Sequence, residues 1–119
     1  MKAIPRLLSA IADPTRLRLL RLLQRQELCV CELMAAVELP QYQVSRHLRE
    51  LRLAGLVEAT RSGRWMHYRI SRFGATDAFC QDLLKVLDLH TRELPDAKRD
   101  DARLSAQLAR GRADRYQCA

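Results

Sequence analysis

Two cysteines separated by a single residue are the side chains of this sequence with the clearest potential for chemistry. Cys29 and Cys31 lie in the segment ELCVCEL, residues 27–33, where a helix is expected to begin. Cys29 and Glu32 have the spacing of a capping box, in which each side chain accepts a hydrogen bond from the other residue's backbone. A thiol at a helix N-terminus lies at the positive end of the helix dipole, which favours the thiolate. Thiolates are the form that soft metals and metalloids bind.

The spacing of this pair also predicts how a ligand could act on the fold. In a continued α-helix, residues i and i+2 point about 200° apart, at roughly 100° per residue. A metalloid that bridges Cys29 and Cys31 is therefore expected to distort the first helical turn. The plainer interpretation is that Cys29 is only a weak cap, with a second cysteine packed beside it.

Composition and charge limit the kinds of protein to consider. A chain of 119 residues, 48% of them hydrophobic, is normally one folded domain. The formal net charge of +7 suits an anionic partner such as nucleic acid, although a solvated basic surface gives the same number. Pro5, Arg6 and Asp13 interrupt the N-terminus, which therefore lacks the apolar stretch of a signal peptide, and no run reaches membrane-spanning length. We expect a soluble, cytoplasmic protein with no membrane partner, in which structural disulfides are not favoured.

Helical patterns fill the first half of the chain. Asp13 and Pro14 form a helix start, with Asp as the N-cap and Pro at the first helical position, and the leucine-rich run TRLRLLRLLQR follows. The segment CVCELMAAV then leads to a break around Pro40. The next segment, QYQVSRHLRELRLAG, is a longer polar helix that ends at Gly55. A short helix, a tight break and a longer polar helix form the layout of a helix-turn-helix.

The longer polar helix has two distinct faces. Its inward stripe consists of Val44, Leu48 and Leu51, at positions i, i+4 and i+7. Its outward residues are predicted to be Gln43, Arg46, His47 and Glu50.

A β-hairpin is expected directly after this helix. LVEAT and WMHYRI have the composition of strands, and RSGR between them supplies the turn, with Gly63 inside it. A hairpin in this place is a wing, and Arg61 and Arg64 at its tip would lie close to phosphates or a minor groove.

The charge is concentrated before the C-terminal segment. Residues 73–89 return to helical spacing, and residues 93–119 are polar, with six basic and five acidic side chains. Because 6 − 5 gives +1 for that segment, +6 of the +7 belongs to residues 1–92. We therefore expect a DNA-binding and dimerisation domain over residues 1–92, followed by a polar tail over 93–119.

Four motifs in order, DPTRLRLLRLL, ELCVCEL, QVSRHLRELRLAGLV and RSGRWMHYRIS, make the chain resemble the ArsR/SmtB family of metalloregulatory repressors. The resemblance runs from Asp13 to Ser71, and ELCVCEL with VSRHL and W-x-HYR is similar to the arsenic-responsive branch. It implies a mainly α winged helix-turn-helix with a β-hairpin wing. It also implies a homodimer that binds an inverted repeat in double-stranded operator DNA and releases it when As(III) or Sb(III) binds thiolates, with no organic cofactor. The dimer face would use residues 4–11 and 79–89.

The resemblance also assigns candidate DNA-contacting residues. On the recognition helix these are Gln41, Gln43, Ser45, Arg46 and His47, to which the wing adds Arg61 and Arg64. Gln favours adenine edges and Arg favours guanine edges. Pro40 departs from the family pattern, because it stands where relatives often place a capping Ser.

The family's metal ligands map onto this chain only in part. Cys29 and Cys31 match, whereas Met34 stands where some arsenic-responsive relatives place a third cysteine. Cys118 could supply the third sulfur, from the same subunit or its partner, and Cys80 is predicted to be buried in an apolar helix. Two thiolates completed by an exogenous thiol or water are the alternative.

Other metals and other functions remain as competing hypotheses. Asp88 and His90 match only the first half of the metal site of the zinc-sensing branch. Residues 1–28 contain none of the N-terminal cysteines of the cadmium/lead branch. Cd(II), Pb(II) and Zn(II) are therefore less favoured as inducers than As(III) or Sb(III). A thiol-redox repressor of the same fold is a second alternative, although a Cys-x-Cys disulfide would close a strained ring. A thiol enzyme ranks last because no catalytic motif accompanies Cys29.

Overall fold

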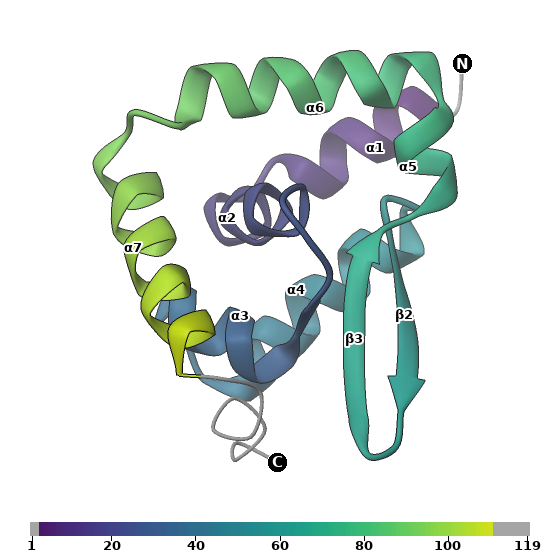
Figure 1. Ribbon diagram of the computed structural model, residues 1–119. Helices are drawn as coiled ribbons and strands as arrows, with labels where there is room; N and C mark the ends of the chain where they lie inside the picture. The colour runs from purple at the N-terminus through teal and green to yellow at the C-terminus, as the bar shows by residue number, and fades with distance from the viewer. Residues whose placement is uncertain (1–2, 111–119) are drawn as a thin grey trace.

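Helices make up most of the structure, and a small antiparallel sheet lies at one side of them (Figure 1). The computed structural model of the protein describes residues 3–110. Its helices are α1 (Ala3–Ile11), α2 (Pro14–Leu23), α3 (Val30–Val37), α4 (Gln41–Leu53), α5 (Arg72–Thr76), α6 (Ala78–Thr91) and α7 (Pro95–Ala109). Its strands are β1 (Leu28–Cys29), β2 (Val57–Ser62) and β3 (Trp65–Ile70).

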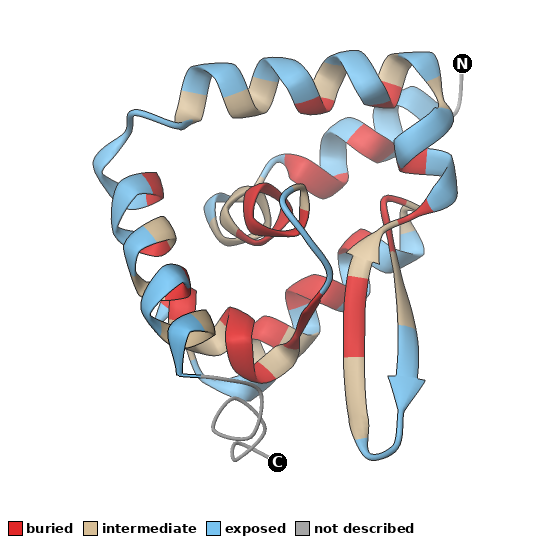
Figure 2. Cartoon of the chain, viewed as in Figure 1, coloured by how far each residue is buried: buried red, intermediate tan, exposed pale blue. Residues whose placement is uncertain are grey.

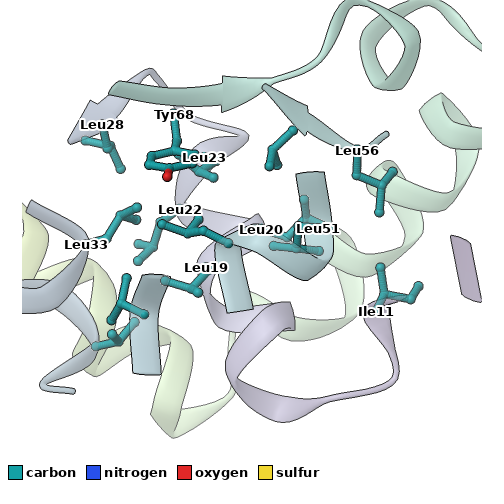
Figure 3. Packing of buried hydrophobic residues seen from close by; sticks show 14 of the residues in the cluster. Ile11, Leu19, Leu20, Leu22, Leu23, Leu28, Leu33, Leu51, Leu56 and Tyr68 are labelled. Atoms are coloured by element: carbon teal, nitrogen blue, oxygen red, sulfur yellow. The ribbon is translucent and has the colours of Figure 1, made fainter. Parts of the chain in front are cut away.

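The core forms around α2, as its run of leucines predicts. Leu19 and Leu22 are completely buried, and Leu20 is 1% exposed. Figure 3 shows these leucines between Leu33 of α3 and Leu51 of α4. Each buried leucine contributes about 1.5–3 kcal/mol relative to an exposed one, so α2 is the element on which the helix-turn-helix is assembled. The remaining helices turn their buried residues toward this centre and their exposed residues outward (Figure 2).

The helix-turn-helix has the predicted layout. α3 ends at Glu38, which adopts a left-handed conformation with φ 55° and turns the chain toward α4. Pro40 is the N-cap of α4 with extended backbone and no capping side chain, so the helix starts at Gln41. Gly55, with φ 85°, follows the end of α4 as expected. The inward stripe of α4 is confirmed, since its predicted members are completely buried: Val44, Leu48 and Leu51.

The wing is confirmed as a hairpin of β2 and β3, and a third strand joins it. The two strands pair antiparallel from Val57 opposite Ile70 to Ser62 opposite Trp65, and Gly63 turns the chain with φ 64°. The two-residue strand β1 pairs with the other edge of β3, with Cys29 opposite His67, so that the strand order is β1-β3-β2. A strand of two residues shows no alternating pattern, and for this reason the sequence does not predict it.

The helix predicted over residues 73–89 is two helices in the structure. Asp77 ends α5 with extended backbone and caps α6, accepting a hydrogen bond from the Cys80 amide at 3.1 Å. The Asp side chain competes for backbone donors in this way, and it therefore favours a new helix start over a continuous helix.

The polar composition of residues 93–119 predicts a tail, whereas the structure folds Pro95–Ala109 into α7, packed against α2 and α3. Ala97 and Leu104 are 4% and 3% exposed, and Asp100 is completely buried. The Asp100 carboxylate accepts hydrogen bonds from Arg18 Nε at 2.8 Å and from Arg18 Nη2 and Arg103 Nη2, each at 2.9 Å. Few apolar side chains of α7 are buried, and much of its contact with the rest of the protein is an ion-pair cluster. For this reason the segment is polar in composition although it is folded.

Two arginines of this cluster also donate hydrogen bonds to carbonyl groups at the C-terminal end of α3. Arg18 Nη2 donates to the carbonyl of Val37 at 2.9 Å, and Arg103 Nε donates to the carbonyl of Ala36 at 2.7 Å. The last carbonyls of a helix have no partner inside it, so α7 and α2 together fix the C-terminal end of α3. A three-helix unit with a helix-turn-helix and a β-hairpin behind it is a winged helix-turn-helix. No helix among residues 3–110 is long and apolar enough to cross a membrane.

Candidate functional site

Cys29 lies at the junction of two elements. It is the last residue of β1 and the N-cap of α3, with an extended backbone of φ −87° and ψ 167°. The predicted capping box is present: the Cys29 amide donates to Glu32 Oε1 at 2.9 Å, and the Cys29 sulfur accepts from the Glu32 amide. Cys29 and Glu32 are each 2% exposed. The thiol is therefore part of the hydrogen-bonded junction between strand β1 and α3, the first helix of the helix-turn-helix.

The protonation of Cys29 differs from the expectation of a favoured thiolate. Burial raises the pKa of the Cys29 thiol above its ordinary value, and the neighbouring Glu32 carboxylate acts in the same direction. Backbone hydrogen bonds from Glu32 and Cys31 oppose this effect without overcoming it. The helix N-terminus does favour a thiolate, but removal of water around a charged sulfur costs more. Burial therefore favours the protonated form of Cys29.

Both cysteines of the pair face one small pocket. Its volume is about 110 Å³, and its lining consists of Cys29, Val30, Cys31, Met34, Gln41, Arg64, Trp65 and Met66. The expected separation of about 200° assumed a continued helix, but only Cys31 is inside α3, whereas Cys29 precedes it in extended conformation. The separation of about 200° therefore does not describe this pair, because only one of the two residues has helical backbone.

The pocket walls belong to different elements. Gln41 is the first residue of α4, and Arg64 lies at the turn of the hairpin. The Arg64 guanidinium lies over the Trp65 ring, 5.2 Å from its centroid. The space beside the two cysteines is thus lined by the beginning of α4 and by the wing.

The outward surface of α4 carries most of the predicted polar residues. Gln41 and Arg46 are exposed, and Gln43 and Ser45 are partly exposed. Tyr42, 68% exposed, and Arg49 also lie on this surface, although neither was predicted to contact DNA. Tyr42, Arg46 and Arg49 are spaced i, i+4 and i+7, so a helical wheel centred on Arg46 would have identified them.

His47 is not on that surface. The structure buries it to 8% exposure on the side of α4 that faces α2, where its Nδ1 accepts a hydrogen bond from Arg16 Nε at 3.2 Å. Asp13 Oδ1, the N-cap oxygen of α2, is 3.9 Å from the same nitrogen. His47 follows the inward residue Val44 by three positions, which places it on the buried face. We therefore assign it to the α2–α4 contact and not to an outward contact.

The wing presents two exposed arginines. Arg61 belongs to β2 and Arg64 to the turn, and both are exposed as predicted. The neighbouring Arg69 on β3 is instead engaged by Glu58 at 3.0 Å and Glu27 at 3.1 Å. The charge available at the hairpin tip thus comes from Arg61 and Arg64.

The other candidate ligands are not gathered at the pocket. Cys118 lies outside the described residues. Cys80 is completely buried in α6, as predicted, and burial together with Asp77 raises its pKa to about 11. Asp88 pairs with Arg92 at 2.6 Å, and Asp101 with Arg25 at 2.9 Å. Within residues 3–110 no group of three His, Cys, Asp or Glu side chains could hold a metal ion.

The sequence of residues 13–59 matches the protein family described as "Bacterial regulatory protein, arsR family". The chain is 48% identical over 67 residues to the arsenic resistance transcriptional regulator ArsR1 of Pseudomonas putida, covering 56% of this chain and 52% of that protein. It is 51% identical over 63 residues to a transcriptional repressor SmtB homolog of Synechocystis, covering 53% and 48%. It is 36% identical over 80 residues to an HTH-type transcriptional regulator of Methanocaldococcus jannaschii, covering 66% and 84%. The chain spans about half the length of the first two relatives.

Solved structures share the fold. HlyU from Vibrio cholerae N16961 aligns with a TM-score of 0.68 and 29% identity, over 77% of this chain and 95% of HlyU. The homodimeric winged helix-turn-helix DNA-binding domain Mb0332 from Mycobacterium bovis aligns with a TM-score of 0.64 and 29% identity, over 79% and 86%. The names of the three relatives by sequence describe regulators of transcription, and none describes an enzyme.

Proposed function

The chain belongs to the ArsR family of bacterial regulatory proteins, and we propose that it is a cytoplasmic transcriptional repressor that releases operator DNA when As(III) or Sb(III) binds Cys29 and Cys31. The observation that carries this proposal is the pocket whose lining includes both cysteines together with Gln41 at the start of α4 and Arg64 on the wing. A ligand of the thiols would act directly on the two elements that a winged helix places against DNA.

The DNA-binding surface of the proposal is the outward face of α4 together with the hairpin tip. Gln41, Gln43, Ser45 and Arg46 would meet base edges or phosphates in the major groove, and Arg61 and Arg64 would meet the backbone or minor groove. Of the residues that the sequence suggested, His47 is left out because it is buried against α2. Tyr42 and Arg49 are added because they are exposed on the same face.

A homodimer on an inverted repeat is the proposed assembly. α1 and α6 both contribute to one core cluster, and they leave large apolar side chains exposed: Ile4, Leu8, Val86 and Leu89. An apolar surface on two neighbouring helices suits a two-fold interface, in which the same patch meets its own copy. The two recognition helices would then enter successive major grooves of a pseudopalindromic site.

The chemistry of trivalent arsenic fits a buried thiol whose pKa is raised, as that of Cys29 is. Arsenous acid is neutral, and each As–S bond that forms breaks one As–OH bond, so that the thiol proton leaves with the hydroxide as water. No net charge enters the pocket in that exchange, and the raised pKa of Cys29 is not an obstacle to it. A divalent cation would have to expel the thiol protons and bring its charge into the pocket. This difference favours As(III) or Sb(III) over Cd(II), Pb(II) or Zn(II).

The third sulfur would come from Cys118, which lies beyond α7. The N-terminal part of α7 lines a pocket with α2, and Arg103 reaches the last turn of α3, so the rest of α7 continues beside α3 (Figure 1). α7 ends at Ala109, nine residues before Cys118 (118 − 109 = 9). An extended segment of that length spans up to about 30 Å. The anchored helix would thereby keep Cys118 within reach of Cys29 and Cys31.

Coupling to DNA would operate through the cap of α3. A metalloid on the Cys29 sulfur would remove the acceptor of the Glu32 amide, and its bulk would press on Gln41 and Arg64. The orientation of α4 and the wing would then differ between the free and the ligated protein. Since both ligands act on one equilibrium, operator DNA must weaken As(III) binding by the factor by which As(III) weakens DNA binding.

The test is a fluorescence-anisotropy titration on an inverted-repeat duplex selected from a random pool. Wild type is bound to saturation, and As(III) is then added. We expect release by wild type and retention by Cys29→Ser and Cys31→Ser. The matched control is Cys80→Ala, a completely buried thiol outside the pocket, which should release as wild type does. Cys118→Ser should require more As(III) for release.

Two outcomes would contradict the proposal. If Cys29→Ser and Cys31→Ser release DNA at the same As(III) concentration as wild type, the inducer binds elsewhere. If wild type ignores As(III) and Sb(III) but releases DNA with Zn(II), Cd(II) or a disulfide-forming oxidant, the inducer assignment is wrong while the repressor function stands.

A further inference from the structure

One residue at the start of α2 makes contacts with three helices. Arg16 Nε donates a hydrogen bond to His47 Nδ1 on α4 at 3.2 Å, and Arg16 Nη1 donates to the Ala10 carbonyl on α1 at 3.3 Å. The Arg16 amide donates to Asp13 Oδ1, the N-cap oxygen of α2, at 3.0 Å. Arg16 thus links the C-terminal end of α1 and the start of α2 to the recognition helix.

The contact between Arg16 and His47 requires a neutral imidazole. A guanidinium only donates hydrogen bonds, so His47 Nδ1 has to be the acceptor, and the ring proton is on Nε2. A protonated His47 would direct a second N–H at the guanidinium and bring two positive charges together across 3.2 Å. This hydrogen bond is therefore lost when His47 gains a proton.

Asp13 offers the protonated ring a different partner. Its Oδ1 is 3.9 Å from His47 Nδ1, and among residues 3–110 Arg16 and Asp13 are the charged groups that pair with His47. On α4 itself Glu50 is nearly one turn away and exposed. Burial acts to raise the pKa of Asp13, but the amide hydrogen bond from Arg16 and the charge of a protonated His47 hold it below its usual value. Asp13 is thus ionised throughout the pH range in which histidine titrates, and it attracts His47 only when the ring is charged.

The hydrogen bond from Arg16 adds a directional contact to the packing of α4. The apolar stripe of α4 holds the helix against the core, but apolar contacts are non-directional. A hydrogen bond is confined to a narrow range of distance and angle, so the bond at His47 fixes how α4 is rotated against α2. Arg46, the residue before His47, is exposed on the surface assigned to DNA. A change of partner at His47 therefore moves the residues that would contact bases.

We propose that Arg16 and His47 are positioning residues for operator binding, and that protonation of His47 exchanges Arg16 for Asp13 and thereby weakens binding to DNA. The inference rests on the DNA-binding surface of the proposed function and does not involve the inducer. Operator affinity would fall as the pH falls through the range in which histidine titrates. A histidine in contact with phosphate would have the opposite effect, because its added positive charge would strengthen binding at low pH.

The test is a fluorescence-anisotropy titration of reduced full-length protein on the operator duplex at about pH 6 and about pH 8, with equal ionic strength. His47→Asn keeps an oxygen in the place of Nδ1 that can accept from Arg16 and cannot be protonated. It should match wild type at the higher pH and lose the pH dependence. His47→Leu and Arg16→Met lack the hydrogen bond and should bind more weakly at both pH values. The matched control is His90→Gln, a change of an exposed histidine on α6, which should behave as wild type does.

Wild type should bind on the order of tenfold more tightly at the higher pH, the factor expected for loss of one hydrogen bond to a charged group. Equal pH dependence of wild type and His47→Asn would overturn the inference, as would wild-type binding that is tighter at the lower pH. As(III) added after each titration separates the inference from the proposed function. Release by As(III) with no effect of pH would overturn this inference alone, whereas pH-dependent binding without any response to As(III) would uphold it and contradict the inducer assignment.

Discussion

Replacement of Asp100 by Ala should destabilise the protein strongly, although Asp100 is distant from the thiol pocket in sequence. The carboxylate is completely buried and accepts three charge-assisted hydrogen bonds, two from Arg18 and one from Arg103. Removing one partner of a buried ion pair costs about 3–5 kcal/mol. The side chains of Arg18 and Arg103 are 25% and 27% exposed, so water can partly solvate them, and we expect the lower end, about 3 kcal/mol.

Urea denaturation followed by the fluorescence of Trp65 measures this loss. With a urea m value of about 1.5 kcal/mol/M, a loss of about 3 kcal/mol lowers the midpoint by about 2 M. Protein concentration must be equal for all variants, because dimer stability depends on it. The matched control is Asp96→Ala, whose side chain is 70% exposed and pairs with Arg99 on the surface of α7. It should change stability by less than about 0.5 kcal/mol.

The reasoning about α7 is refuted if Asp100→Ala loses less than about 1 kcal/mol, the amount expected of one ordinary hydrogen bond. In that case the buried cluster does not hold α7 against α2 and α3. If α7 is held as proposed and Cys118 supplies the third sulfur, the same variant should also require more As(III) for DNA release.

Three further predictions concern the recognition helix, the thiol and the turn after α4. Arg46→Ala should weaken operator binding about tenfold or more and reduce its salt dependence, whereas Arg99→Ala on α7 should leave both unchanged in the same anisotropy assay. Cys29 should react with iodoacetamide more slowly than an unfolded cysteine at pH 8, because its pKa is raised, and the difference should shrink as the pH rises. By linkage, the stability that this thiol contributes is present below about pH 8.5 and is lost as the pH rises through the folded pKa, which pH-dependent urea midpoints of wild type and Cys29→Ser will detect. Gly55→Ala should cost about 1–2 kcal/mol from the left-handed backbone alone, since the added Cβ would meet Phe73 only at 3.9 Å; an unchanged urea midpoint would contradict it.

Regular elements with strong patterns could be predicted from the sequence. The N-cap at Asp13, the inward stripe of α4 and the turns at Gly55 and Gly63 each depend on local chemistry, and the structure confirms them. The break at Asp77 was missed because apolar spacing continues across it, although an Asp side chain can start a helix anew.

Long-range contacts account for the rest of the differences. His47 was wrongly predicted to face outward, although its spacing from Val44 agrees with the buried face. Its polar partner there, Arg16 on α2, is a contact between two helices that the sequence of α4 alone does not show. α7 was missed because one of its three buried residues is the charged Asp100, which accepts hydrogen bonds from two arginines on different helices. The pKa of Cys29 reflects burial under the wing, and burial is a property of the folded chain. The presence of Cys29 and Met66 in one pocket lining likewise depends on β1 joining β3.

The affinity of wild type for As(III), measured with and without saturating operator DNA, tests the central claim most directly. If metalloid binding and DNA binding favour different arrangements of the α3 N-cap at Cys29, the As(III) affinity must fall in the presence of DNA. It must fall by the same factor by which As(III) lowers DNA affinity, because the coupling free energy is reciprocal. An As(III) affinity that is identical in the two conditions would contradict the account.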